Sequence, residues 1–164
     1  MLQIRIATLS HLPAIVAIYN QAILDGFATA DTEIFQTEDK RRWFEEHDAQ
    51  HPIFVATFNE EVVGWLSLTA YRSGRKALSG VREVSYYVHA CHQRKGIADA
   101  LMHHVYTAAP QIGIQYLLAI VISKNTKSIS FLSKHHFVEW GRLPSVVDYN
   151  GIICDHLYFG RKFF

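Results

Sequence analysis

Cysteine is scarce in this sequence, and long apolar runs are missing. The two cysteines, Cys91 and Cys154, lie far apart and lack the CxxC spacing typical of metal or redox sites. No apolar run approaches the ~20 residues that a membrane-spanning helix needs. The first ten residues, MLQIRIATLS, show no signal-peptide pattern. We therefore expect a cytoplasmic protein that has no disulfide and makes no membrane contact.

An excess of charge of one sign is also missing. Lysine plus arginine number 16 and aspartate plus glutamate 15, so no global basic field would attract nucleic acid nonspecifically. We expect no nucleic-acid partner, and any anion recognition must be local. Hydrophobic residues make up 49% and charged residues 19% of the chain, which excludes a disordered protein. The length suits one domain covering residues 1–164.

Common nucleotide and metal motifs are absent as well. The GxGxxG run of dinucleotide-binding folds and the GxxxxGK[ST] run of P-loop proteins do not occur, so neither dinucleotide nor ATP is favoured. Among ten histidines, the best local zinc candidate is the cluster of His89, Cys91 and His92. Structural zinc usually takes four ligands in paired spacing, and no second pair follows. We expect no metal.

The N-terminal half predicts a strand, two helices and a hairpin. Alternating residues predict a strand at the start of the chain, followed by Ser10 as a helix N-cap. Apolar residues recur at helical spacing from His11 to Leu24. The segment 26–36 is rich in glycine, threonine and aspartate, which predicts a loop. Further along we expect a helix from Thr37 toward His47 and strands at 52–58 and 61–71 around the turn Asn59–Glu60.

The C-terminal half alternates strands with helices and ends in a second hairpin. We expect a strand at 81–88, a basic turn at 89–96, a helix at 97–110, a strand at 116–122, a helix at 127–136 and two strands around Asn150–Gly151 within 137–164. This order predicts a mixed α/β fold. Its central sheet should be largely antiparallel, with helices on both faces.

The basic turn between strand 81–88 and helix 97–110 can hold an anion. Unpaired N–H groups and the positive end of the helix point into such a turn. Gly96 lets the backbone approach a ligand closely, and Arg94 and Lys95 add positive charge. A lone basic-glycine tripeptide is usually a solvated turn. Its position between a strand and a helix favours an anion site.

The run QRKGIA is similar to the Q/R-x-x-G-x-G/A signature of the GNAT superfamily of N-acetyltransferases, which binds the coenzyme A pyrophosphate there. The likeness to phosphinothricin acetyltransferase-like members extends through IYNQAI, ATADTE, WFEEH, VVGWLSLTAYR, REVSYYV, NTKSISFL and HFVEWGRLP. This resemblance implies the GNAT acyl-CoA N-acyltransferase fold and an enzyme that uses acetyl-CoA as co-substrate, with no metal. The implied acceptor is the amino group of a small amino acid such as phosphinothricin, methionine sulfoximine or methionine sulfone.

The resemblance also implies a coenzyme A site. In the basic turn it assigns Gln93, Arg94, Lys95, Gly96, Ile97, Ala98 and Asp99. The main chain of Tyr86, Tyr87 and Val88 would receive the pantetheine arm, and a backbone N–H there would stabilise the oxyanion. Asn125 and Ser128 complete the set. Asn125 can also be a helix N-terminal residue, since asparagine favours such positions.

Acetyl transfer to an amine requires a base, because an alkyl amine with a pKa near ~10.4 is protonated at neutral pH. Glu83 lies before the basic turn and matches the glutamate that the family uses as general base, acting directly or through a water. An isolated glutamate could instead be an edge-strand carboxylate paired with Arg82 or Arg75. The resemblance favours the catalytic role.

The acceptor side is implied by a loop and by the end of a strand. Residues 28–33, which include Thr29 and Asp31, resemble the segment that walls the acceptor site. Arg72 could pair with a carboxylate or an oxyacid, or it could be a solvated loop charge. Apolar surface would come from Phe27, Trp43 and Tyr71, although aromatic residues are more often simply core.

Two positions depart from the family pattern. Leu132 stands where many relatives place Tyr or His, which can protonate the leaving thiolate, and leucine cannot donate a proton. Since a thiol has a pKa near ~8.5, water could supply the proton. His136 stands where relatives usually have glycine, and histidine is costlier if that position needs a positive φ.

Other functions and an oligomeric state follow from the same likeness. The fold alone does not fix the acceptor, so acetylation of protein N-termini or lysines is an alternative. Leu132 also allows a catalytically silent acyl-CoA sensor. Relatives pair through the region after Phe137, where the strands of this chain are apolar and aromatic. We therefore expect a homodimer.

Overall fold

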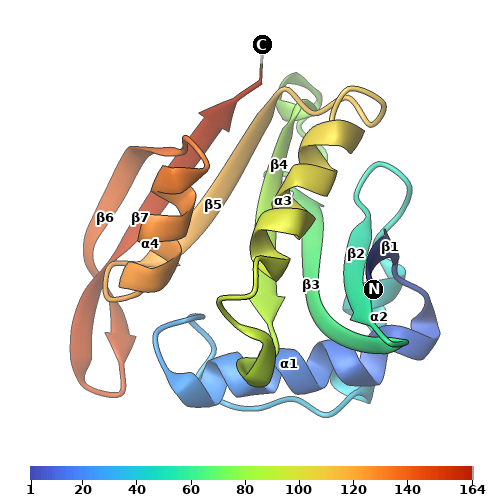
Figure 1. Ribbon diagram of the computed structural model, residues 1–164. Coiled ribbons are helices and arrows are strands. Elements are labelled where there is room, and N and C mark those ends of the chain that lie inside the picture. Colours follow the sequence, from blue (N-terminus) through green and yellow to red (C-terminus); the bar gives the residue numbers. More distant parts are fainter. Residues whose placement is uncertain (164) are drawn as a thin grey trace.

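A central sheet organises the computed structural model, which describes residues 1–163 (Figure 1). Within that range seven strands pair in the order β1-β2-β3-β4-β5-β7-β6. They are β1 (Leu2–Ile6), β2 (Ile53–Phe58), β3 (Glu61–Ala70), β4 (Val81–Val88), β5 (Tyr116–Ile122), β6 (Val138–Tyr149) and β7 (Ile152–Lys162). Every neighbouring pair is antiparallel except β4 and β5. The predicted, largely antiparallel sheet is confirmed; the expected last segment also included Phe164, which lies outside the described residues.

The helices follow the predicted order, but the first begins differently. They are α1 (Leu12–Asp25), α2 (Arg41–Glu45), α3 (Ile97–Ala108) and α4 (Thr126–Lys134). The prediction of Ser10 as the N-cap of α1 was wrong. Thr8 instead begins a 3-10 turn, Leu9–His11, and its backbone N–H donates to Nδ1 of His11 at 2.9 Å. Because the histidine side chain satisfies this N–H, α1 starts directly after the turn.

Strands β3 and β4 present alternate residues to two different layers. Side chains such as Leu66 and Val84 belong to the core that α3 covers, together with Leu101 and Val105 of that helix. Trp65 faces the opposite way and packs with Ile15 and Ile18 of α1 and with Ile53 and Val55 of β2. Helices therefore cover both faces, as predicted, with α3 and α4 on one side of the sheet (Figure 1).

The sheet opens between its two parallel strands. The register of β4 with β5 pairs Val81 with Tyr116, Arg82 with Leu117 and Glu83 with Leu118, and ends there. Beyond that point the two strands diverge (Figure 1). In the described chain, no strand pairs with residues 84–88 on their β5 side. Among the described residues, the C-terminal half of β4 thus has an unpaired edge on its β5 side.

Left-handed backbone marks several of the predicted turns. Asn59 and Glu60 have φ values of 48° and 67°, which suits a tight turn between twisted antiparallel strands. His136, after α4, has a φ of 62°, so the position where relatives usually have glycine does require a positive φ in this chain. The hairpin between β6 and β7 turns through Asn150 and Gly151. No helix among the described residues has the length and apolarity to cross a membrane.

Candidate active site

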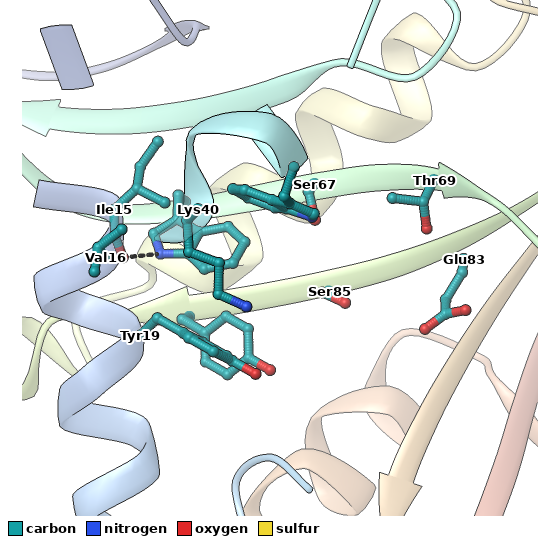
Figure 2. Close-up of a pocket in the computed structure, with 11 residues that line it drawn as sticks. Ile15, Val16, Tyr19, Lys40, Ser67, Thr69, Glu83 and Ser85 are labelled. Carbon is teal, nitrogen blue, oxygen red and sulfur yellow. Dashed lines mark hydrogen bonds between the residues drawn. The ribbon is translucent and has the colours of Figure 1, made fainter. Parts of the chain in front are cut away.

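A cavity of about 180 Å³ lies between α1, the segment around α2, and strands β3 and β4 (Figure 2). Aromatic rings form one end of it, and hydroxyl and carboxyl groups of the strands form the other. Its lining comprises Ile15, Val16, Tyr19, Lys40, Trp43, Trp65, Ser67, Thr69, Glu83, Ser85 and Tyr87. The strand residues in this list have odd numbers because they share one face of the sheet.

Glu83 is placed in the interior of the sheet, opposite Thr69 of β3 and beside Leu118 of β5. Burial raises the pKa of its carboxyl group. The alternative prediction, an edge-strand ion pair, was wrong, since β4 is a central strand and Glu83 joins none of the ion pairs between described residues. Arg82 points to the other face and donates to the carbonyl oxygens of Gln50, at 3.0 Å, and Ser79. Glu83 therefore stands in the cavity with an unpaired carboxyl group.

The loop at residues 28–33, named the acceptor loop after its predicted role, contacts the cavity through Tyr19. The Tyr19 hydroxyl lies 2.7 Å from Oγ1 of Thr29 and donates to Oδ2 of Asp31 at 2.5 Å. Burial raises the pKa of Tyr19, so its hydroxyl stays protonated and can donate. The Tyr19 ring meets the Tyr87 ring edge-on, with centroids 4.9 Å apart. Thr29 and Asp31 thus stand behind the cavity wall and fix one of its rings.

Three other predicted acceptor residues lie away from this lining. Phe27 has a φ of 58° and packs on Tyr149, with ring centroids 4.7 Å apart. Tyr71 and Arg72 follow the end of β3, and the guanidinium carbon of exposed Arg72 lies 5.6 Å from the Tyr71 ring centroid. Their roles in acceptor binding stay predictions. Trp43, in contrast, lines the cavity.

Most of the cavity lining was not predicted from the sequence. Ser67, Thr69 and Ser85 lie in segments that carry the family likeness, but no role was assigned to them, although alternation along β4 from Glu83 places residue 85 on the same face. Lys40 was missed because it belongs to a short 3-10 turn, Glu38–Lys40, that the sequence pattern assigned only to a helix. Its place in the cavity depends on the path of the preceding loop.

The basic turn carries a run of unpaired backbone donors at the start of α3. Arg94 and Gly96 are left-handed, with φ values of 58° and 78°, and Ala100 is the first residue to donate back, to the Gly96 carbonyl at 2.9 Å. No described residue accepts a hydrogen bond from the N–H groups of residues 94–99. A Cβ added at Gly96 would meet no atom within 4 Å. The turn is therefore open toward an incoming ligand.

Side chains around the turn limit the negative charge near it. Lys95 donates through Nζ to the Cys91 carbonyl at 2.9 Å, and Gln93 and Arg94 are exposed. Asp99 accepts from Nζ of Lys134 at 2.6 Å and lies 2.9 Å from Nε2 of buried His135. The hydrogen bond from Lys134 lowers the pKa of Asp99. The carboxylate is thus held by α4 and does not oppose an anion at the helix start.

The start of α4 lies across the opening from β4. Asn125 caps this helix, since its Oδ1 accepts from the Ser128 N–H at 3.1 Å. Tyr86 donates its hydroxyl to Oγ of Ser128 at 3.3 Å, and burial raises its pKa. Leu132 is fully buried in the core. Asn125, Ser128 and Tyr86 are thus brought together by hydrogen bonds, and their role in coenzyme binding stays a prediction.

Residues 20–137 match the acetyltransferase (GNAT) family. The chain belongs to this family. It is 35% identical over 160 residues to YwnH of Bacillus subtilis (strain 168), provisionally assigned as a phosphinothricin acetyltransferase, covering 97% of this chain and 98% of that protein. It is 30% identical over 145 residues to the L-methionine sulfoximine/L-methionine sulfone acetyltransferase of Pseudomonas aeruginosa, covering 87% and 84%. A Salmonella typhimurium structure of yncA, solved with acetyl-CoA, superposes with a TM-score of 0.89 at 27% identity, covering 98% of this chain and 93% of that one.

As a member of the GNAT family the chain is an N-acetyltransferase that uses acetyl-CoA. The described residues suit this co-substrate, because the turn at 94–99 offers unpaired N–H groups at a helix N-terminus and no Cβ at Gly96. Within residues 1–163, no three His, Cys, Asp or Glu side chains are grouped so as to hold a metal ion.

Proposed function

We propose that this acetyltransferase modifies the α-amino group of a small amino acid with a tetrahedral polar head, with Glu83 as the general base. Phosphinothricin, methionine sulfoximine and methionine sulfone are the acceptors we favour. The observation that carries the proposal is the half-buried, unpaired carboxyl group of Glu83 in a small cavity. The names of the Bacillus and Pseudomonas relatives support the same class of acceptor.

The proposed mechanism begins with deprotonation of the acceptor. Glu83 takes a proton from the acceptor ammonium group, directly or through one water. A raised pKa makes this carboxylate a stronger base than an exposed glutamate, which favours proton transfer near neutral pH. When bound, acetyl-CoA supplies an acetyl group activated as a thioester. The unpaired edge of residues 86–88 would hold the pantetheine arm, and the N–H groups of 94–99 the pyrophosphate.

The size of the cavity supports a small acceptor over a peptide. Pockets for drug-sized ligands enclose roughly 300–1,000 Å³. The cavity beside Glu83 has a volume of about 180 Å³, with aromatic rings and hydroxyl groups around it. A single amino acid suits this space better than a folded protein segment does.

The proton for the leaving thiolate needs no dedicated acid in this scheme. Leu132 is fully buried and has no proton to donate. Because a thiol has a pKa near ~8.5, water can reprotonate the thiolate at neutral pH.

We also propose that the protein is a cytoplasmic homodimer that pairs through β6 and β7. Several large apolar side chains on these strands are exposed, and they support the assignment: Val138, Trp140, Leu143, Val146, Ile152 and Ile153. Sedimentation of the purified protein at the mass of one chain would overturn this part.

The experiment is turnover with acetyl-CoA and a panel of acceptors, followed by release of the coenzyme thiol. The panel contains L-phosphinothricin, L-methionine sulfoximine, L-methionine sulfone and N-terminal peptides. Glu83→Gln should lower kcat roughly 10²- to 10⁴-fold, because proton abstraction contributes about that much. Glu61→Gln, an exposed change on β3, is the matched control and should keep full activity.

Three results would contradict the proposal. Full activity of Glu83→Gln would remove Glu83 as the base. Acetylation of peptides but not of amino acids would replace the acceptor class. Tight coenzyme binding by calorimetry without turnover on any amine would indicate an acyl-CoA sensor.

A further inference from the structure

Lys40 is the one cation among the described residues that line the acceptor cavity, and it faces aromatic rings. It ends the 3-10 turn that follows the acceptor loop. Its Nζ lies 3.7 Å from the centroid of the Phe35 ring and 5.2 Å from that of Tyr19. Figure 2 shows the ammonium group directed into the cavity beside Tyr19. Attraction to the ring faces holds the charge in a partly desolvated position.

The Phe35 ring next to Lys40 is held in position by hydrogen bonds between the Asn20 side chain and the Phe35 backbone. Asn20 of α1 donates through Nδ2 to the Phe35 carbonyl at 2.8 Å and accepts through Oδ1 from the Phe35 N–H at 3.0 Å. These two bonds set the end of the acceptor loop against α1. The position of the ammonium group is therefore built by tertiary contacts rather than left to a free surface chain.

No described carboxylate pairs with this ammonium group. The two acidic neighbours in the same turn are used elsewhere. Glu38 pairs with Arg41 at 3.0 Å, and Asp39 accepts from the Gln36 N–H at 2.7 Å. A half-buried cation without a carboxylate partner is available to pair with a ligand that supplies the negative charge.

The opposite charge in the cavity stands at its other end. Figure 2 shows Glu83 beyond Ser85, away from Lys40. A molecule that matches both ends carries an amine and, apart from it, an oxygen group that is negative or strongly polar. Arg72 does not compete for this role inside the cavity, because it is exposed and absent from the lining.

We propose that Lys40 determines acceptor specificity by binding an oxygen group of the amino acid while Glu83 faces its amine. Two groups of the acceptor offer the required chemistry, the α-carboxylate and the tetrahedral head. This inference rests on the proposed function and adds the residue that selects the acceptor. A simple alkyl amine offers neither group and should be a poor acceptor.

The test compares Lys40→Gln and Lys40→Arg with Arg42→Gln as the matched control. Arg42 has a 91% exposed side chain and pairs with Glu46 on the protein surface, so its loss removes the same charge two residues away. Binding of L-methionine sulfone to the coenzyme-free protein is read from tryptophan fluorescence, since Trp43 and Trp65 line the cavity. KM and kcat are measured with acetyl-CoA, and calorimetric acetyl-CoA binding checks that each variant is folded.

Lys40→Gln should weaken L-methionine sulfone binding and raise KM roughly 10- to 100-fold, because one charge-assisted hydrogen bond is lost, with kcat changed less than about threefold. Lys40→Arg should keep most of the affinity, and Arg42→Gln all of it. Equal affinity of Lys40→Gln and the unchanged protein would overturn the role of Lys40 while leaving the proposed function intact. Failure of the unchanged protein to acetylate any amino acid would overturn both.

Acceptor analogues separate the two sources of the oxygen group and need no variant. The carboxamide of L-methionine sulfone lacks the carboxylate, and L-methionine lacks the tetrahedral head. The analogue that lacks the group bound by Lys40 should bind the unchanged protein roughly 10- to 100-fold more weakly than L-methionine sulfone does. The Lys40→Gln variant should bind this analogue and L-methionine sulfone with equal affinity. Equal affinity of all three compounds for the unchanged protein would overturn the proposal.

Discussion

The substitution Gly96→Ala separates the stability of the basic turn from its proposed role in binding acetyl-CoA. Gly96 has a φ of 78° and a ψ of 8°, and a left-handed conformation costs an alanine about 1–2 kcal/mol. Alanine also restricts the unfolded chain, which offsets roughly 0.4–1 kcal/mol. An added Cβ meets no atom within 4 Å, so no clash is added. The net loss of about 0.5–1 kcal/mol should lower the Tm of this chain by about 1–4 °C.

Gly113→Ala is the control for this strain. Gly113 has a φ of 70°, a Cβ there would also meet nothing within 4 Å, and the residue lies beyond the C-terminal end of α3. Both variants should therefore lose the same stability. Only Gly96→Ala places a methyl group beside the unpaired N–H groups that we propose bind the pyrophosphate, and we expect its Kd for acetyl-CoA to rise at least about tenfold.

Thermal unfolding with and without acetyl-CoA measures both effects. At a ligand concentration of 100 Kd, binding stabilises a protein by about 2.7 kcal/mol, or about 5–11 °C at this chain length. A tenfold weaker Kd reduces the gain to about 1.4 kcal/mol, or about 3–6 °C. If acetyl-CoA raised the Tm of the unchanged protein and of both variants by the same amount, the assignment of residues 94–99 to the pyrophosphate would be refuted.

Three further predictions concern the acceptor cavity and the C-terminal hairpin. Because burial raises the pKa of Glu83, kcat/KM should rise with pH, with an apparent pKa above the usual glutamate range. This rise should be absent in Glu83→Gln. The raised pKa of Glu83 contributes stability to the fold below the unfolded pKa of glutamate. This contribution is lost as pH rises through the folded pKa. Glu83→Gln should therefore unfold at a higher Tm than the unchanged protein at pH 8 but not at pH 4. Tyr19→Phe removes the hydroxyl that holds the acceptor loop, which should cost about 1–3 kcal/mol and speed limited proteolysis in residues 28–33. Gly160→Ala would place a Cβ 2.0 Å from Cε3 of Trp140, costing about 1–3 kcal/mol in urea unfolding, and Trp140→Ala in the same chain should recover part of that loss.

Elements with a long, regular pattern could be predicted from the sequence, whereas their ends could not. The apolar spacing of α1 and α3 and the alternation of β4 identify these elements without tertiary information. The start of α1 was missed because Thr8 and Ser10 are both good caps by residue type. The choice between them depends on the His11 side chain, which reaches back to the Thr8 N–H.

The basic turn and its left-handed glycine could be predicted from the sequence, but most of the cavity lining could not. A glycine between a strand and a helix is a local signal, and Gly96 does take a left-handed φ. The walls of the cavity come instead from small polar residues such as Ser67 and Ser85, which the β3–β4 register brings side by side. Lys40 enters the cavity because the Asn20 side chain fixes the loop before it, a contact between residues 15 apart. The family likeness pointed to the segment around Phe27, but it could not predict that the Phe27 ring packs on Tyr149 and not in the cavity.

The two faces of β4 belong to different parts of the molecule, so the cavity proposed for the acceptor can change without altering the core under α3. Residues 83, 85 and 87 line the cavity, and their even-numbered neighbours contribute to the core that α3 covers. A mutant library confined to Ser67, Thr69 and Ser85 should therefore yield enzymes with new amine preferences and an unaltered demand for acetyl-CoA. An inserted residue within β4 would turn each set of side chains toward the wrong layer. We therefore expect the fold to tolerate exchanges of cavity residues along β4 but not an insertion within it.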